Sequence, residues 1–273
     1  MIQEASAVGS VVSLWRYPVK SMMGEELNAT QIAERGVVGD RVYALVDSAT
    51  GKVVSAKNPQ KWAQLFDCRA TFLEPPSRDT VTPVRIVLPD GTFFLSSEDN
   101  ANQMLSAVLG RQVQLEQVVP PPPILEEYWP DLEGLPHRQT VTDEAILEDT
   151  FFDLAPVHLL TTSTLNYLQK CCPTGRFEAR RFRPNIAIAP PIYEASLLEN
   201  TWIGHTLAIG EEVRLKITNP CPRCVMTTLP QGDLPEDINI LKTAMQHNQG
   251  NIGVYANILR GGTIRRGDRV WLT

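Results

Sequence analysis

Short apolar runs separated by turn residues dominate the first half of the chain. They are rich in β-branched residues and are typical of strands. The runs predicted to be strands cover residues 11–17, 41–46, 84–88 and 92–95. Pro89, Asp90 and Gly91 separate the last two runs, and this combination favours a tight turn between paired strands. The first half is therefore predicted to be mostly β.

One helix follows these strands. Ser97 can cap its start through the side-chain hydroxyl, and Gly110 can end it. Its apolar face would comprise Ala101, Leu105, Val108 and Leu109.

The second half repeats the pattern of short strands with few helices. A helix is expected after Thr161 or Thr162, and another after Asp237, up to Gly250. Strands are expected at 157–160, 185–188, 202–204, 207–210, 213–218 and 225–228, and again at the end of the chain. These elements predict a mainly β protein with a few helices, of the α+β class.

A run of four prolines, residues 120–123, is the clearest break in the chain. Consecutive prolines cannot join a helix or the interior of a sheet and favour an extended linker. Two domains are therefore predicted, one over residues 1–119 and one over residues 124–273. The acidic and aromatic stretch from 126 to 148 has no assignable function from sequence.

Composition excludes several classes of protein. With 273 residues and 43% hydrophobic content the chain can bury a full core, and its net charge of −6 argues against a general nucleic-acid partner. No apolar run approaches the roughly 20 residues of a membrane span, and the N-terminus lacks the features of a signal peptide. Five cysteines, two of them adjacent (Cys171 and Cys172), do not form a disulfide framework. A reducing cytoplasm is the predicted location.

The candidate chemistry centres on residues 219–230, where Cys221 and Cys224 flank Arg223. A guanidinium beside a thiol favours the reactive, metal-binding thiolate. The pattern allows a redox dithiol, half of a zinc site, or one thiolate ligand of a softer metal. The remaining cysteines and histidines are too scattered for zinc, and the predicted strand at 225–228 does not provide the helix of a thioredoxin-type dithiol. A single thiolate on a transition metal remains, with most other ligands supplied from elsewhere.

Basic residues at predicted strand ends are candidates for holding an anion. Lys20 and Ser21 follow the first strand, Arg41 opens the second, and the triplet Arg180, Arg181 and Arg183 precedes another. Guanidinium and ammonium groups bind phosphate well, but solvated surface charges would give the same pattern.

Five motifs together resemble a known family. Tyr-Pro-Val-Lys-Ser at 17–21, Gly-Asp-Arg at 39–41, Arg-Phe-Arg-Pro-Asn at 181–185, Cys-Pro-Arg-Cys at 221–224 and the terminal Gly-Asp-Arg-Val-Trp are similar to those of MOSC proteins with a MOSC N-terminal β-barrel domain. This family includes the mitochondrial amidoxime-reducing component and its bacterial relatives. The resemblance covers nearly the whole chain. It implies an N-terminal β-barrel-like domain, a C-terminal MOSC β-barrel domain and a molybdenum cofactor in the cleft between them.

The resemblance also implies roles for individual residues. Cys224 corresponds to the molybdenum ligand, and Cys221 would be structural or dispensable. The positions corresponding to the cofactor-binding site are Lys20, Ser21, Arg41, Arg183, Pro222, Arg223, Cys224 and Tyr255. Pro222 would make only a backbone contact, Arg223 would flank the metal, and residues 153–155 could offer backbone groups.

The implied activity is a two-electron removal of oxygen from N-hydroxylated compounds, with electrons supplied by a separate donor protein. No residue stands out as the proton donor. The alternative is a carrier of molybdenum cofactor or of sulfur, in which Cys224 would hold a persulfide. A sulfur carrier needs the thiol but has no use for Lys20, Arg41 and Arg183, which favours the reductase.

Overall fold

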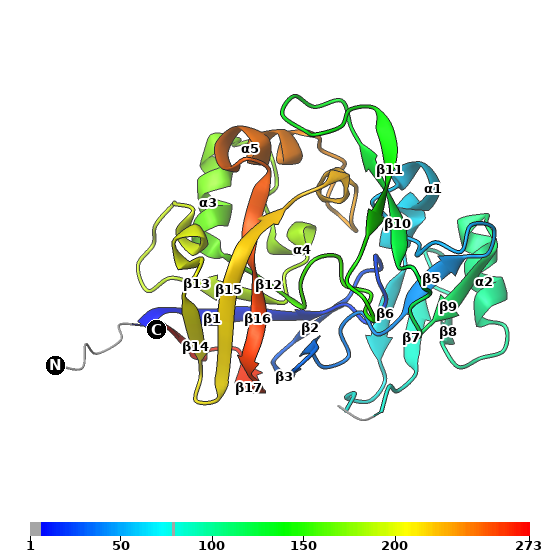
Figure 1. The fold of residues 1–273 in the computed structure, drawn as a ribbon, viewed down its shortest axis with the longest axis horizontal. Helices are drawn as coiled ribbons and strands as arrows, with labels where there is room; N and C mark the ends of the chain where they lie inside the picture. The colour runs from blue at the N-terminus through cyan, green and yellow to red at the C-terminus, as the bar shows by residue number, and fades with distance from the viewer. Residues whose placement is uncertain (1–6, 78–79) are drawn as a thin grey trace.

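The computed structural model of the chain describes residues 7–77 and 80–273, which fold mainly into β-strands (Figure 1). Seven strands form a closed barrel in the order β13-β12-β16-β15-β14-β18-β1, because β1 also pairs with β13. The barrel strands are β1 (Ala7–Arg16), β12 (Val157–Thr161), β13 (Ile186–Ala189), β14 (Thr206–Ile209), β15 (Val213–Pro222), β16 (Asn251–Arg260) and β18 (Arg269–Leu272). Only β12 and β13 run parallel; the other neighbours are antiparallel. The predicted mainly β class is confirmed.

Strand β1 closes a barrel whose other strands all come from the second half of the chain. Leu14 lies opposite Ile186 on one side, and Ala7 lies opposite Trp271 on the other. The division of the chain at the proline run stays a prediction. The pairing of β1 means that residues before that run complete the barrel built by residues after it.

The rest of the first half forms small antiparallel sheets beside the barrel (Figure 1). Strand β2 (Glu25–Leu27) pairs with β1 and extends the barrel sheet. The strands of the small sheets are β3 (Ala29–Ala33), β4 (Gly36–Val37), β5 (Ala44–Asp47), β6 (Arg69–Phe72), β7 (Val84–Val87), β8 (Phe93–Leu95) and β9 (Val113–Glu116). A hairpin of β10 (Ile124–Trp129) and β11 (Thr140–Ala145) follows, and β17 (Gly262–Arg265) returns to pair with β3. The helices are α1 (Pro59–Trp62), α2 (Ala101–Leu109), α3 (Thr162–Cys171), α4 (Ala179–Phe182) and α5 (Asn239–Asn248).

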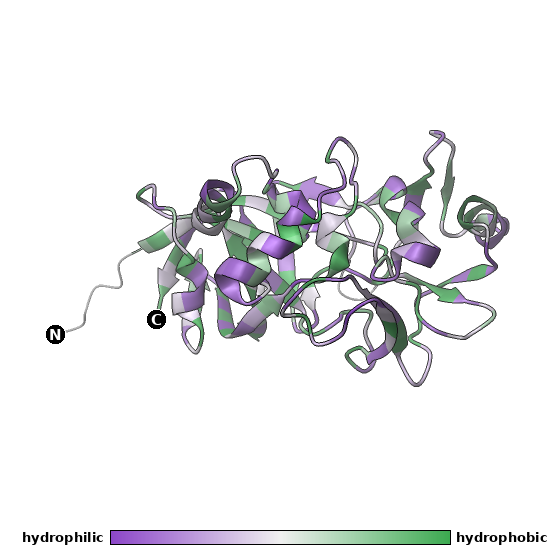
Figure 2. Ribbon diagram, turned by 90° about the horizontal axis from the view of Figure 1, so that it is seen from above, coloured by the Kyte–Doolittle hydropathy of each residue, from purple (hydrophilic) through white to green (hydrophobic). Residues whose placement is uncertain are grey.

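Each half has its own apolar core. Leu14 and Trp202 belong to the barrel core, and Phe94 belongs to the core of the first-half sheets. Leu229, which follows the cysteine pair, packs into that first-half core and so ties the end of the cysteine segment to the opposite half. Apolar and polar residues alternate along the elements, as expected for elements with one buried face (Figure 2).

Several local predictions are confirmed. Asp90 and Gly91 form the turn between β7 and β8, with Gly91 at φ +84°, a conformation that glycine adopts easily. Thr161 caps α3 by accepting a hydrogen bond from the backbone N–H of Thr164 at 3.2 Å. Gly110 ends α2 in a left-handed conformation, although α2 begins after Asn100 and not at Ser97.

The predicted strands at 202–204 and 225–228 are wrong. Trp202 ends a 3₁₀ helix (Leu198–Trp202), and Val225–Thr228 is also a 3₁₀ helix. In the second case the hydroxyls of Thr227 and Thr228 donate to carbonyls three residues earlier, at 3.0 and 2.8 Å. These local hydrogen bonds stabilise a helical turn and outweigh the strand preference of β-branched residues. The cysteine segment therefore leaves a strand, β15, rather than entering one.

In the described part of the chain, no helix combines the length and apolar character that crossing a membrane would require.

Candidate functional site

A cavity of about 380 Å³ is lined by residues from both sides of the proline run. Side chains that are up to 235 positions apart in the sequence meet in it. Its lining includes all the predicted site residues: Lys20, Ser21, Arg41, Arg183, Pro222, Arg223, Cys224 and Tyr255.

Three of these residues have an unusual backbone conformation. Ser21, Arg41 and Arg183 have φ values of 65°, 50° and 54°, in the left-handed region that side-chain-bearing residues seldom adopt. Such conformations persist where the surrounding structure enforces them, and they cluster at ligand sites. Asp40, next to Arg41, connects the segments that carry these residues, because its carboxylate accepts from the backbone N–H of Tyr17 at 2.7 Å and from Asn185 Nδ2 at 2.9 Å. The three loops are thus joined at one carboxylate.

Lys20 is buried, which excludes its interpretation as an exposed turn residue. Its Nζ donates to the carbonyl oxygen of Phe151 at 2.7 Å and to the carboxylate of Asp153. Burial lowers the pKa of Lys20, and the negative charge of Asp153 opposes that shift. The side chain of Asp153, for which only backbone contacts were expected, is therefore part of the site.

Arg183 carries an unused hydrogen-bond donor. Its Nη1 donates to the carbonyl oxygen of Met22 at 2.8 Å, and its guanidinium lies 4.1 Å from the ring centre of Tyr17. Its Nη2 is buried and has no partner in the described part of the chain. Burial lowers the pKa of Arg183 to about 10, because the charged form is poorly solvated. An anion beside Nη2 would relieve both the missing bond and the uncompensated charge.

The basic triplet divides into three different roles. Arg180 forms ion pairs with Glu178 and Asp233 outside the cavity. Arg181 lines the cavity but donates to four backbone carbonyls, those of Arg176, Thr227, Leu229 and Pro235, at 3.0–3.2 Å. Of the three arginines, Arg183 has a buried donor, Nη2, that finds no partner among the described residues.

Arg41 lines the cavity as Arg183 does, and both guanidinium groups contact the buried ring of Tyr17. The guanidinium of Arg41 pairs with the carboxylate of Asp40 and lies 4.9 Å from the ring centre of Tyr17. The Tyr17 ring thus contacts two guanidinium groups, and cation–π contacts favour the charged form of an arginine. Arg41 pairs with an acidic neighbour as a surface residue would, yet it faces the cavity.

The two cysteines have different surroundings, and both are free. Arg223 Nη1 lies 2.7 Å from Cys221 Sγ. Its Nη2 donates to the carbonyl oxygen of Phe182 at 2.9 Å. Its Nε is buried and has no partner among the described residues. The guanidinium expected to support a reactive thiolate therefore holds Cys221, not Cys224.

The surroundings of Cys224 favour its protonated thiol. Burial raises its pKa to about 11, Glu127 adds to the increase, and the positive charges of Lys57 and Arg223 oppose it. A cation bound at its sulfur would reverse this preference by favouring the thiolate.

Tyr255 packs against His158, with ring centres 6.1 Å apart in an edge-to-face arrangement. Burial raises the pKa of Tyr255, and Cys221 contributes in the same direction. Burial lowers the pKa of His158 to about 3, and its Nε2 lies 3.2 Å from the carbonyl oxygen of Ile252. Both rings are neutral at physiological pH and form an uncharged side of the cavity.

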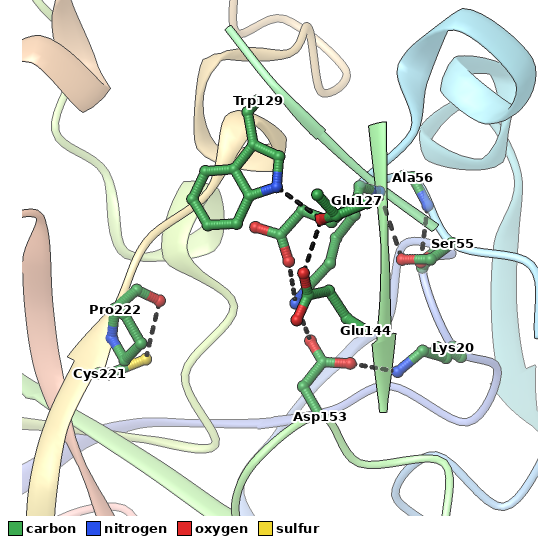
Figure 3. A network of polar contacts seen from close by, with 12 residues as sticks. Lys20, Ser55, Ala56, Glu127, Trp129, Glu144, Asp153, Cys221 and Pro222 are labelled. Atoms are coloured by element: carbon green, nitrogen blue, oxygen red, sulfur yellow. Dashed lines mark hydrogen bonds and ion pairs between the residues drawn. The ribbon is translucent and has the colours of Figure 1, made fainter. Parts of the chain in front are cut away.

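Sequence reasoning missed a chain of buried charges in this cavity. Lys57 Nζ lies 2.9 Å from Glu127 Oε2 and 3.5 Å from Asp153 Oδ2, and Asp153 in turn binds Lys20 (Figure 3). Neither Lys57 nor Glu127 lies in a recognisable motif, and charged residues are normally solvated. No local signal in the sequence could have identified this pair.

Across residues 7–77 and 80–273, no group of three or more His, Cys, Asp or Glu side chains is arranged to hold a metal ion. A metal bound by Cys224 would need most of its ligands from a bound cofactor.

Comparison with known proteins gives two family matches. The MOSC domain matches residues 148–271, and the MOSC N-terminal beta barrel domain matches residues 8–71. Mitochondrial amidoxime reducing component 2 of Rattus norvegicus is 23% identical over 98% of this chain and 85% of its own length. Mitochondrial amidoxime-reducing component 1 of Mus musculus is 24% identical over 97% and 82%. Among solved structures, the YUAD protein from Bacillus subtilis is 11% identical, with a TM-score of 0.47 over 97% of this chain and 95% of that chain.

Proposed function

We propose that this protein, which belongs to the MOSC-domain proteins with an N-terminal MOSC β-barrel domain, is a molybdenum-cofactor-dependent reductase of N-hydroxylated compounds. The observation that carries the proposal is the convergence of the eight cofactor-site residues on one cavity, together with a free thiol and unused buried arginine donors. Its distant relatives are named as amidoxime reducing components, which supports an oxidoreductase activity.

The donor set fits the phosphate of molybdopterin. Arg183 Nη2 and Arg223 Nε are buried N–H groups without partners in the described residues, and each is an unfavourable feature until an acceptor is bound. Charge-assisted bonds from guanidinium to phosphate are among the stronger hydrogen bonds in proteins. Arg183 and Arg41 would hold the anion in the cavity, with Ser21 offering a hydroxyl.

Lys20 is held differently, because Asp153 already neutralises it. An incoming dianion would have to compete with this carboxylate. We infer that Lys20 and Lys57 share Asp153 in the cofactor-free protein and reorient toward the cofactor when it binds. Asp153 would then keep both ammonium groups charged and positioned.

Cys224 would be the one protein ligand of the metal. Burial raises the pKa of this thiol, and a bound cation would favour its thiolate. When bound, the molybdenum cofactor supplies two-electron oxygen-atom transfer. Cys221 stays with Arg223 and would orient that guanidinium rather than bind the metal.

The overall reaction breaks an N–O bond. An amidoxime takes up two electrons and two protons and yields one amidine and one water. The electrons would come from a separate donor protein. The chain's own contribution is to bind the cofactor, exclude bulk water from the cavity and hold charged groups at fixed positions.

The carrier alternative is less well supported. A persulfide forms through a nucleophilic thiolate, whereas burial keeps the Cys224 thiol protonated. A sulfur carrier also has no need for Arg183 or Arg41 in the same cavity.

Metal analysis tests the proposal. Protein produced in a host that makes molybdenum cofactor should contain close to one molybdenum per chain and reduce benzamidoxime with reduced methyl viologen as electron source. Cys224→Ala should lose molybdenum and activity, whereas Cys221→Ala should retain much of both. Wild-type protein without molybdenum, or a more severe loss in Cys221→Ala than in Cys224→Ala, would refute it.

A further inference from the structure

The acidic and aromatic stretch without an assignable function forms one wall of the cavity. It folds into the β10–β11 hairpin, which joins the first-half sheets through a bridge between Val53 and Leu125. Its residues that line the cavity include Glu127, Trp129 and Glu144.

Strand alternation separates these residues from the other acidic residues of the hairpin. Glu127 and Trp129 are two positions apart and point to the same face, where Thr142 lies opposite Glu127 and Glu144 lies two residues further along β11. Asp143 points to the other face and forms an ion pair with Lys52 at 2.6 Å. The hairpin therefore has one face toward the cavity and one whose charges are neutralised.

The cavity face is rigidly organised. Trp129 Nε1 donates to Thr142 Oγ1 at 2.7 Å, and that hydroxyl donates to Glu144 Oε1 at 2.6 Å (Figure 3). The ring of His137 packs edge-on against Trp129 at 5.3 Å. Lys57 fixes one oxygen of Glu127. Side chains held in this way lose little conformational freedom when a ligand binds.

This face offers acceptors and an aromatic surface. Within the described ranges no Lys, Arg or His forms an ion pair with Glu144, and Lys57 engages only Oε2 of Glu127. Carboxylates accept hydrogen bonds and cannot donate them when ionised. Glu127, Glu144 and Cys224 line the same cavity.

We propose that Glu127, Trp129 and Glu144 are specificity-determining residues that favour N-hydroxylated bases, whose reduced products are cations, over N-hydroxylated compounds with neutral products. The inference rests on the proposed reductase function. An amidine presents parallel N–H donors that match a carboxylate, and its protonated form is a flat cation suited to the face of an indole. The neutral amidine formed with two electrons and two protons takes up a third proton from solvent to become the amidinium, and Glu127 and Glu144 would stabilise this cation.

A pair of substrates with the same ring tests this. Benzamidoxime yields benzamidine, a cation at neutral pH, whereas benzhydroxamic acid yields benzamide, which is neutral. In cofactor-loaded protein, Glu144→Gln and Glu127→Gln should each lower the ratio of kcat/KM for benzamidoxime to that for benzhydroxamic acid by about tenfold to a hundredfold, the range expected for a charged hydrogen bond. Asp143→Asn removes the same charge from the opposite face and should leave the ratio unchanged.

Binding of benzamidine, measured by calorimetry, gives a readout that is independent of turnover. Its Kd should rise by about the same factor in Glu144→Gln and not in Asp143→Asn. Unchanged ratios and an unchanged Kd in both glutamine variants would overturn the proposal, as would an equal loss for both substrates.

Molybdopterin content distinguishes the specificity proposal from the alternative that these carboxylates bind the pterin. If Glu127→Gln or Glu144→Gln purifies without molybdopterin, these carboxylates hold the pterin and the specificity proposal is wrong. If wild-type protein contains no molybdenum and reduces neither compound, the reductase function fails by itself. Weakened benzamidine binding by Glu144→Gln would then still support a cation-binding wall, and unaltered binding would refute it.

Discussion

Replacing Arg183 by methionine tests whether the unused guanidinium donor is a cofactor contact. In the cofactor-free protein two effects oppose each other. The variant loses the bond from Nη1 to the Met22 carbonyl, but it also removes a buried charge that the protein solvates poorly, as the lowered pKa of about 10 indicates. Each effect is on the order of 1–3 kcal/mol, so the cofactor-free variant should have nearly the stability of the wild type.

The loaded protein should respond differently. One charge-assisted hydrogen bond to phosphate contributes about 1.5–3 kcal/mol, and its loss should weaken cofactor affinity about tenfold to a hundredfold. Because a ligand that binds only the folded state raises the free energy of unfolding, the increase in Tm on loading should shrink correspondingly.

Pterin content and the Tm of loaded and cofactor-free protein measure both expectations. Arg180→Met is the matched control, since Arg180 pairs with Glu178 and Asp233 outside the cavity. Full molybdopterin occupancy in Arg183→Met, with an undiminished rise in Tm, would mean that Arg183 does not contact the cofactor.

The fragment 124–273 lacks β1 and leaves the barrel open between β13 and β18, so it should fail to fold cooperatively in thermal unfolding; a sharp transition would contradict this. Gly253→Ala should lower the free energy of unfolding by more than about 2 kcal/mol, because a Cβ would lie 2.3 Å from His158 Nε2 and 2.5 Å from the Leu159 carbonyl oxygen at φ +81°. Gly51→Ala, at φ +71° with open space around it, should cost only about 1 kcal/mol in the same urea titration, and equal losses would refute the steric argument. Burial lowers the pKa of His158 to about 3, below its unfolded value near 6.5, so the unfolded chain binds more protons between these values. The free energy of unfolding should fall by up to about 1.4 kcal/mol per pH unit as the pH drops from about 6 to 4. If His158→Gln shows the same dependence of this free energy on pH, groups other than His158 cause it.

Local patterns in the sequence predicted the elements that local forces control. Asp90 and Gly91 specify their turn, Thr161 caps its helix, and Gly110 ends another, because each interaction joins residues only a few positions apart. The mainly β class follows from the frequency of short β-branched runs. The failure at 225–228 has the same origin, because hydroxyl groups of Thr227 and Thr228 stabilise a helical turn in a segment whose composition favours a strand.

The resemblance also selected eight residues, all of which lie among those that line the cavity. Each motif alone was equally consistent with surface charge, since Lys20 in a turn or Arg183 in a basic triplet has no distinctive local pattern. The order and combination of the motifs identified these residues as candidate site residues, which the local sequence around each motif did not.

Tertiary structure decided which charged groups are buried together. Lys57, Glu127 and Asp153 form one chain of ion pairs, although up to 96 positions separate them in the sequence, and nothing near any of them signals the others. It also decided that Arg223 donates to the distant carbonyl of Phe182, that Arg181 holds backbone carbonyls while Arg183 keeps a donor without a partner in the described residues, and that β1 closes a barrel made by the second half. Propensity, capping and turn chemistry act over a few residues and can be read from the sequence. Burial, pKa and ion pairing depend on which distant segments the fold brings into contact.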